Sequence, residues 1–104
     1  MRTNFILLPA IMNLRHSDKA MDMSANAMKA FNPGTEVNVF RYNSNGIRGS
    51  AIQQRIDENC SNFHCTLGKS NKMYQFRVIF NCDKFNDQEM KKIVFEWLDR
   101  IKLL

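Results

Sequence analysis

Two runs in which apolar and polar residues alternate are the feature that most constrains the fold of this chain. Side chains of a β-strand point to opposite faces in turn, so each run predicts a strand with one face toward a core. Residues 68–72 between the runs contain glycine, serine and asparagine, which predicts an antiparallel hairpin. The expected core residues are Phe63, Cys65, Leu67, Tyr74, Phe76, Val78 and Phe80.

Two segments are predicted to be helices. The first has a start signal and a stop signal, and the second has a start signal and a long apolar stripe. Ser17 is a good N-cap for a helix that runs to Phe31, and the sequence Asn-Pro-Gly at 32–34 ends it. Near the C-terminus, Asn86 and Glu89 form a capping box. Apolar residues then recur at helical spacing from Met90 onward. We therefore expect one helix after the N-terminal strand and one at the end of the chain.

The remaining segments complete the predicted order of elements. Residues 4–8 are mainly apolar and are expected to form a short strand that Pro9 stops. Residues 36–42 are rich in β-branched and aromatic side chains and are also expected to be a strand. Ser50 and Gln53 have capping-box spacing, and Ile52 and Ile56 would form one apolar stripe, so we expect a short helix over 50–56.

These elements define the expected fold class, which is α/β in the broad sense and α+β in the strict one. The prediction is a single compact domain over residues 1–104, with an antiparallel or mixed sheet of three to four strands and about three helices, in the order β-α-β-α-β-β-α. A chain of 104 residues has room for one core. Its hydrophobic fraction of 44% and charged fraction of 24% are typical of a globular protein rather than a disordered one.

A glycine turn precedes the expected short helix and is the main candidate for a functional site. Its residues are Gly46, Ile47, Arg48, Gly49 and Ser50, a G-x-x-G sequence followed by a serine. A helix N-terminus presents free backbone N–H groups and a positive dipole end, both of which favour a phosphate oxygen. Arg48 would add a charged hydrogen bond.

From Val37 to Leu104 the chain resembles a K-homology (KH) domain, a fold that binds single-stranded nucleic acid. The resemblance lies in the G-x-x-G turn at 46–49, the apolar pair Ile52 and Ile56, the hairpin strands and the amphipathic C-terminal segment. In that family the glycine loop grips the nucleic-acid backbone while bases lie along an apolar groove. The resemblance implies that Gly46, Ile47, Arg48 and Gly49 form the clamp.

The charge distribution favours an anionic partner. The formal net charge is +5 and the pI is about 9.4. Residues 59–82 contain three cations, Lys69, Lys72 and Arg77, and no acid. Lys69 and Lys72 flank the hairpin turn, and His64, Gln75 and Arg77 share the polar face of its strands. We therefore expect a small basic protein that binds RNA or single-stranded DNA through the glycine turn and the basic hairpin.

A protein-interaction module is the alternative. Met21, Met23 and Met28 give the first helix more flexible apolar side chains than one core stripe needs, and methionine surfaces adapt to partners. A partner could use this helix or a sheet edge. Such a protein would form a homodimer or act as a host-directed inhibitor of the kind phages make.

No cofactor, metal or catalytic group is expected. Cys60, Cys65 and Cys82 lack the spacing of a disulfide framework or a zinc site, which favours reduced thiols in the cytoplasm. No segment is long and apolar enough to cross a membrane, so no membrane partner is expected. The protein is predicted not to be an enzyme, although His64 beside Arg77 leaves a small metal-independent nuclease open.

Overall fold

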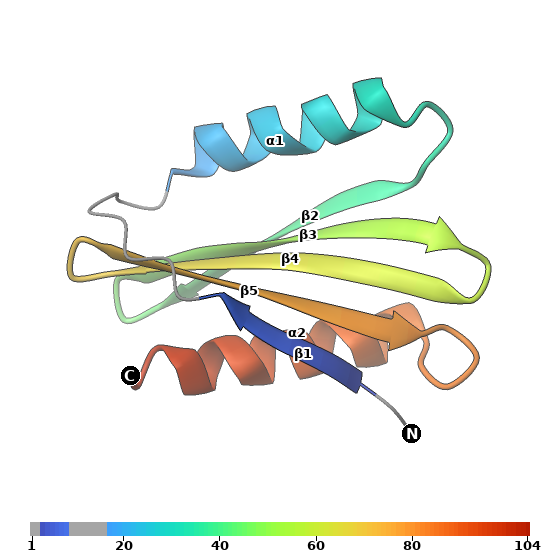
Figure 1. The fold of residues 1–104 in the computed structure, drawn as a ribbon. Helices are drawn as coiled ribbons and strands as arrows, with labels where there is room; N and C mark the ends of the chain where they lie inside the picture. The colour runs from blue at the N-terminus through green and yellow to red at the C-terminus, as the bar shows by residue number, and fades with distance from the viewer. Residues whose placement is uncertain (1–2, 9–16) are drawn as a thin grey trace.

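The centre of the molecule is an antiparallel sheet of five strands in the order β1-β5-β4-β3-β2 (Figure 1). The computed structural model describes residues 3–8 and 17–104, and for residues 3–8 it describes the backbone. The elements are β1 Thr3–Leu8, α1 Asp18–Phe31, β2 Val37–Ser44, β3 Ile47–Asp57, β4 Cys60–Lys69, β5 Lys72–Asn81 and α2 Asp87–Ile101.

The hairpin predicted from the two alternating runs is confirmed. β4 and β5 pair without a register shift, with Phe63 opposite Val78 and Leu67 opposite Tyr74. The seven expected core residues lie on one face, and all are buried except Tyr74, which is half-buried. The turn itself is only two residues long, Ser70 and Asn71.

The prediction of a short helix over 50–56 is wrong, because this segment is the middle of β3. Ile52 and Ile56 are four residues apart, a spacing that places side chains on one face of a helix and also on one face of a strand. The capping-box residues instead bond across the sheet. Ser50 Oγ lies 3.2 Å from Thr66 Oγ1, and Gln53 donates to Ser61 Oγ at 3.0 Å.

The described chain therefore forms two helices rather than three, and the order is β-α-β-β-β-β-α. The strand count is higher than the predicted three to four because β3 replaces the expected short helix. β1, an expected strand, pairs antiparallel with β5 at the far edge of the sheet. The predicted stop of the first strand at Pro9 lies outside the described residues. The coarse prediction of one compact α+β domain is confirmed.

The two helices cover opposite faces of the sheet (Figure 1). α2 covers the face that carries the hairpin's apolar residues, and its own Met90, Val94, Leu98 and Ile101 are buried there. Its predicted start is confirmed, since Asn86 and Glu89 form both hydrogen bonds of the capping box. This side of the sheet is the main core.

α1 covers the β2 and β3 side of the other face and buries much less. Ser17 caps it as predicted, by accepting a hydrogen bond from the Ala20 N–H. Ala25 is its only buried residue, and it packs with Val37 and Ile52 in a small second cluster. Neither α1 nor α2 is long and apolar enough to cross a membrane.

Candidate nucleic-acid interface at the hairpin tips

The β2–β3 and β4–β5 turns lie at the same end of the sheet, because alternate turns of an antiparallel meander share an end (Figure 1). Both are two-residue turns in which each residue has a positive φ: 53° and 80° at Asn45 and Gly46, 52° and 62° at Ser70 and Asn71. These are type I′ hairpins. Asn-Gly between two strand-like runs is the strongest short hairpin signal in a sequence, and it would have identified β3 as a strand.

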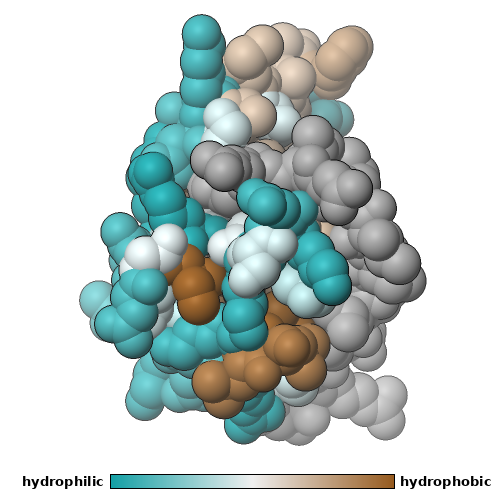
Figure 2. Space-filling view, turned by 90° about the vertical axis from the view of Figure 1, so that its left-hand side faces the viewer, coloured by the Kyte–Doolittle hydropathy of each residue, from teal (hydrophilic) through white to brown (hydrophobic). Residues whose placement is uncertain are grey.

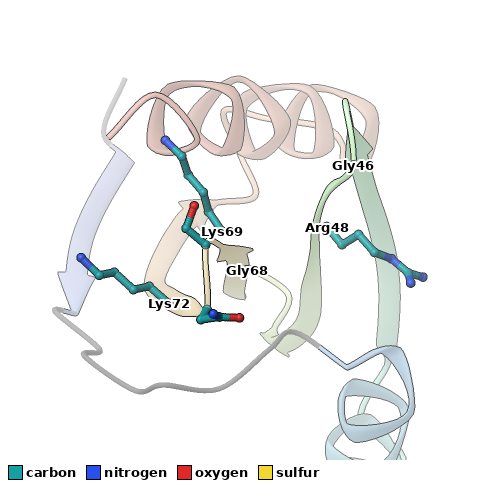
Figure 3. Close-up of a pocket in the computed structure, with 7 residues that line it drawn as sticks. Gly46, Arg48, Gly68, Lys69 and Lys72 are labelled. Carbon is teal, nitrogen blue, oxygen red and sulfur yellow. The ribbon is translucent and has the colours of Figure 1, made fainter.

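A hollow of about 400 Å³ lies between the two hairpin tips (Figure 3). Four of the residues predicted for nucleic-acid binding line it: Gly46, Arg48, Lys69 and Lys72. Gly68, Ser70 and Asn71 complete the lining. The structure thus brings the glycine turn and the basic hairpin together, although no helix begins at the glycine turn.

The three cations surround the hollow and point in different directions (Figure 3). Arg48 points toward α1, where its guanidinium bonds the Asp18 carboxylate. Lys69 points toward α2 and donates to the Lys102 carbonyl oxygen at 2.6 Å. Within residues 3–8 and 17–104, neither Lys69 nor Lys72 forms an ion pair with a carboxylate. The two lysines therefore leave positive charge uncompensated beside the hollow.

The other three residues of the glycine segment serve the sheet. Ile47 is half-buried against the main core, and Ser50 is fully buried in its bond with Thr66. Gly49 lies where a Cβ atom would stand 2.5 Å from the Thr66 carbonyl oxygen. Gly49 is thus a close-approach position between β3 and β4, whereas Gly46 supplies the positive φ of the turn.

His64, Gln75 and Arg77 share a polar sheet face as predicted, but this is the face on which α1 lies. His64 is directly opposite Arg77, and Thr66 is opposite Gln75. All three predicted residues are half-buried, while Thr66 is buried and contacts the Met21 sulfur of α1 at 3.5 Å. None of the three lines the hollow between the hairpin tips. Two groups of predicted site residues are therefore separate in space.

The surroundings of His64 favour the neutral form of its imidazole. Burial lowers its pKa, and the positive charge of Arg77 lowers it further. Its Nε2 atom lies 2.9 Å from the Asn62 side-chain amide nitrogen, so it accepts that hydrogen bond. Two atoms beside it, Asn62 Oδ1 and Arg77 Nε, are buried and have no hydrogen-bond partner among the described residues.

A polar network that the sequence did not reveal joins α2 to the β2–β3 tip. The Tyr42 hydroxyl donates to Asp99 Oδ1 at 2.5 Å, and Lys102 Nζ contacts both Asp99 (3.2 Å) and Ser44 Oγ (2.9 Å). The hydrogen bond from Tyr42 lowers the pKa of Asp99, and burial together with that bond raises the pKa of Tyr42. Because Lys69 bonds the Lys102 carbonyl, this network also supports the rim of the hollow.

The end of the molecule that carries both tips has a mixed surface. Figure 2 shows it as mostly hydrophilic, with hydrophobic areas among the polar residues. The chain ends on this side, and Leu103 and Leu104 are exposed there (Figure 1). Among the described residues, polar and charged groups therefore make up most of this surface.

The described residues contain no group of three or more metal-ligating side chains. Cys60, Cys65 and Cys82 are free thiols, and burial raises the pKa of Cys65 strongly. Cys65 is therefore a protonated core residue rather than a nucleophile.

Fold and site together define a class: an α+β domain with an antiparallel meander sheet, one helix on each face and a cationic hollow between two hairpin tips. No protein-family model matches the chain, and neither curated proteins nor solved structures gave a match.

Proposed function

We propose that this protein binds the phosphate backbone of single-stranded nucleic acid, RNA or DNA, at the end of the sheet that carries the two type I′ turns. The observation that carries the proposal is the hollow between the tips, with Arg48, Lys69 and Lys72 around it. Arg48 comes from the β2–β3 hairpin, and both lysines come from the β4–β5 hairpin. Cations grouped around one concave surface can contact successive phosphates of a bound strand.

The local charge balance supports an anionic ligand. Two carboxylates that bond residues of the β2–β3 hairpin are also paired with cations: Asp18 with Arg41 and Arg48, and Asp99 with Lys102. Lys69 and Lys72 have no such partner in the described chain. A phosphate that enters the hollow would meet these two lysines without first displacing a carboxylate from either.

The shape of the lining also suits a close approach. Gly46 and Gly68 present backbone without side chains, and the space where a Gly46 Cβ would stand has no atom within 4 Å. Ser70 and Asn71 add polar groups at the second tip. Phosphate oxygens accept hydrogen bonds from backbone N–H groups and from polar side chains of this kind.

Base recognition contributes little in this proposal. Tyr42 is buried, and the Phe40 ring lies beneath the Lys91 ammonium, 5.0 Å from the ring centroid. Neither ring is free to stack on a base. Binding should therefore be carried by phosphate contacts, tolerate changes in base sequence, and weaken steeply with salt.

The test is fluorescence anisotropy with labelled RNA and DNA oligonucleotides over a series of salt concentrations. We expect binding at low salt whose affinity falls with a log–log slope of about −1.4, since the two uncompensated lysines neutralise about two phosphates. Lys72→Glu should weaken binding about tenfold and make the slope shallower, because it removes a phosphate contact and repels the backbone.

Lys92→Glu is the matched control, since Lys92 is exposed on α2 and the charge change is the same. It should leave affinity within about twofold of the native value, the residual effect of net charge alone. Absence of binding at low salt, or equal losses in the two variants, would refute a site at the hairpin tips.

The exposed residues of α1 favour protein interaction as a second candidate function. Met23 is 64% exposed and Phe31 is 84% exposed, although both are large and apolar. Such residues are costly to leave in water and are common at interfaces. The double variant Met23→Ser and Phe31→Ser tests this function. If it loses its association with a co-purifying protein but binds oligonucleotides as before, this second function would take precedence.

A further inference from the structure

The outer edge of β2 is an open edge of the sheet among the described strands. β2 is the last strand of the sheet and pairs only with β3 among the described strands. It is eight residues long, Val37–Ser44, and its pairing with β3 continues without a shift from one end to the other. The backbone groups on its far side are thus arranged in a regular row.

One hydrogen bond identifies the residues whose backbone groups form this row. The Glu36 carbonyl accepts from the Arg55 N–H at 3.1 Å, so Glu36 directs its backbone groups toward β3. Antiparallel strands alternate between residues that bond inward and residues that do not. The outward N–H and C=O groups therefore belong to Val37, Val39, Arg41 and Asn43.

This edge lacks the features with which proteins usually prevent strand addition. The strand contains no proline, no lysine and no bulge. Its single charge, Arg41, is balanced by Asp18 at 2.9 Å and Asp22 at 2.6 Å. A second strand could approach without meeting an uncompensated cation.

We propose that the occupant of this edge is β2 of a second copy of the chain, paired antiparallel about a two-fold axis at Phe40. In that register Val37 pairs with Asn43 of the second copy, and Val39 pairs with its Arg41. All four outward residues then bond one another, and the pairing forms about eight hydrogen bonds. No two like charges lie opposite each other, which would be destabilising.

Other self-pairing registers are less favourable. A two-fold axis at Arg41 places the two Arg41 side chains opposite each other. An axis at Val39 leaves the outward groups of Asn43 without a partner. Because the axis at Phe40 alone avoids both, the strand is complementary to itself, and this favours a second copy over an unrelated peptide.

The dimer would form one continuous sheet through both copies. In an antiparallel pairing the hairpin tips of the two copies lie at opposite ends, so each copy keeps its own hollow accessible. α1 lies over β2 and β3, so the two α1 helices would come alongside each other on one face (Figure 1). The inference is independent of nucleic-acid binding and does not require it.

The first test is the molar mass of the full chain by light scattering and sedimentation over a concentration series. We expect a dimer that dissociates on dilution and is insensitive to salt, because backbone hydrogen bonds hold it. Val39→Pro should give a folded monomer, since it removes an N–H that points away from β3. A native chain that remains monomeric at the highest concentrations overturns the proposal.

The second test locates the axis with cysteine substitutions. The proposed register brings the two residues at position 40 directly opposite, with Cα atoms about 4.5 Å apart in a non-hydrogen-bonded pair. That distance is compatible with a disulfide, so Phe40→Cys should form a covalent dimer under mild oxidation. Asn38→Cys is the matched control. In the proposed register position 38 pairs with Tyr42 of the second copy, so the two introduced cysteines would not lie opposite each other. Equal cross-linking by both variants, or by neither, would overturn this register.

Discussion

Single residues at the β2–β3 hairpin show why the same glycines support two different interpretations. Gly46 and Gly49 fit a G-x-x-G loop by spacing, yet one occupies the second position of a type I′ turn and the other lies inside a strand. Gly46 is needed for its φ of 80°, and Gly49 is needed because Thr66 and Leu67 leave no room for a side chain. The spacing alone does not separate these roles.

The distinction between these glycines predicts different responses to substitution. Gly49→Ala should lower the free energy of unfolding by about 1–3 kcal/mol, because its Cβ would lie 2.5 Å from the Thr66 carbonyl oxygen and force the strands apart. Gly46→Asn should change stability by less than about 1 kcal/mol, since asparagine tolerates a left-handed conformation. Chemical denaturation measures both. Equal losses would mean that close approach is not what position 49 requires.

His64 predicts a specific dependence of stability on pH. Its pKa is lowered in the folded state by burial and by Arg77, so as pH falls below about 6.5 the unfolded chain takes up the proton first. Stability contributed by the neutral imidazole is full above that pH and decreases as pH falls toward the folded-state pKa.

Replacing His64 by glutamine tests this dependence. Between pH 7 and pH 5 the native protein should lose more stability than His64→Gln, with a difference in slope below about 1.4 kcal/mol per pH unit. The carboxylate Asp99 titrates in a more acidic range, since its pKa is lowered from the usual value. Parallel curves for the two proteins would show that His64 is as accessible to protons when folded as when unfolded.

At the scale of elements, the two helices are attached to the sheet to very different degrees. α2 buries Met90, Val94, Leu98 and Ile101 in the main core, whereas α1 buries only Ala25. Most of the free energy that holds a helix in a protein comes from packing of its apolar face. α2 should therefore unfold with the whole domain, and α1 should open locally.

The helix caps provide a matched pair of substitutions. Asn86→Ala removes the cap of α2 and should lower global stability by about 1 kcal/mol. Ser17→Ala removes the cap of α1 and should speed hydrogen exchange in α1 with little change in the melting temperature. Hydrogen exchange followed by mass spectrometry, with thermal melting alongside, distinguishes the two. A larger global loss from Ser17→Ala would contradict the difference in packing.

At the scale of the whole molecule, the meander decides which segments meet. Alternate turns share an end of the sheet, so Gly46 and Lys72, far apart in sequence, line one hollow. The same order leaves β2 at an edge. Nucleic-acid binding is proposed at the hairpin tips and dimerisation at the β2 edge, and only the first should depend strongly on salt. An experiment that refutes one proposal therefore leaves the other intact.

Much of the fold was predictable because local signals coincide with packing. The alternation from Phe63 to Phe80 and the capping box at Asn86 gave the β4–β5 hairpin and α2 correctly. β3 was missed because the spacing of Ile52 and Ile56 fits both a helix and a strand. Of the predicted site, the structure brings together Gly46, Arg48, Lys69 and Lys72 and holds His64, Gln75 and Arg77 on the face beside α1.

The sequence by itself determined where polar and apolar side chains alternate, where helices begin, and that the hairpin carries an excess of positive charge, because these properties depend on neighbours along the chain. Only the tertiary structure decided that residues 47–57 form a strand, since hydrogen bonds to both β2 and β4 outweigh a local helix signal. It also decided which cations remain uncompensated. Ion pairs such as Arg48 with Asp18 join residues 30 positions apart, and no local pattern encodes that distance.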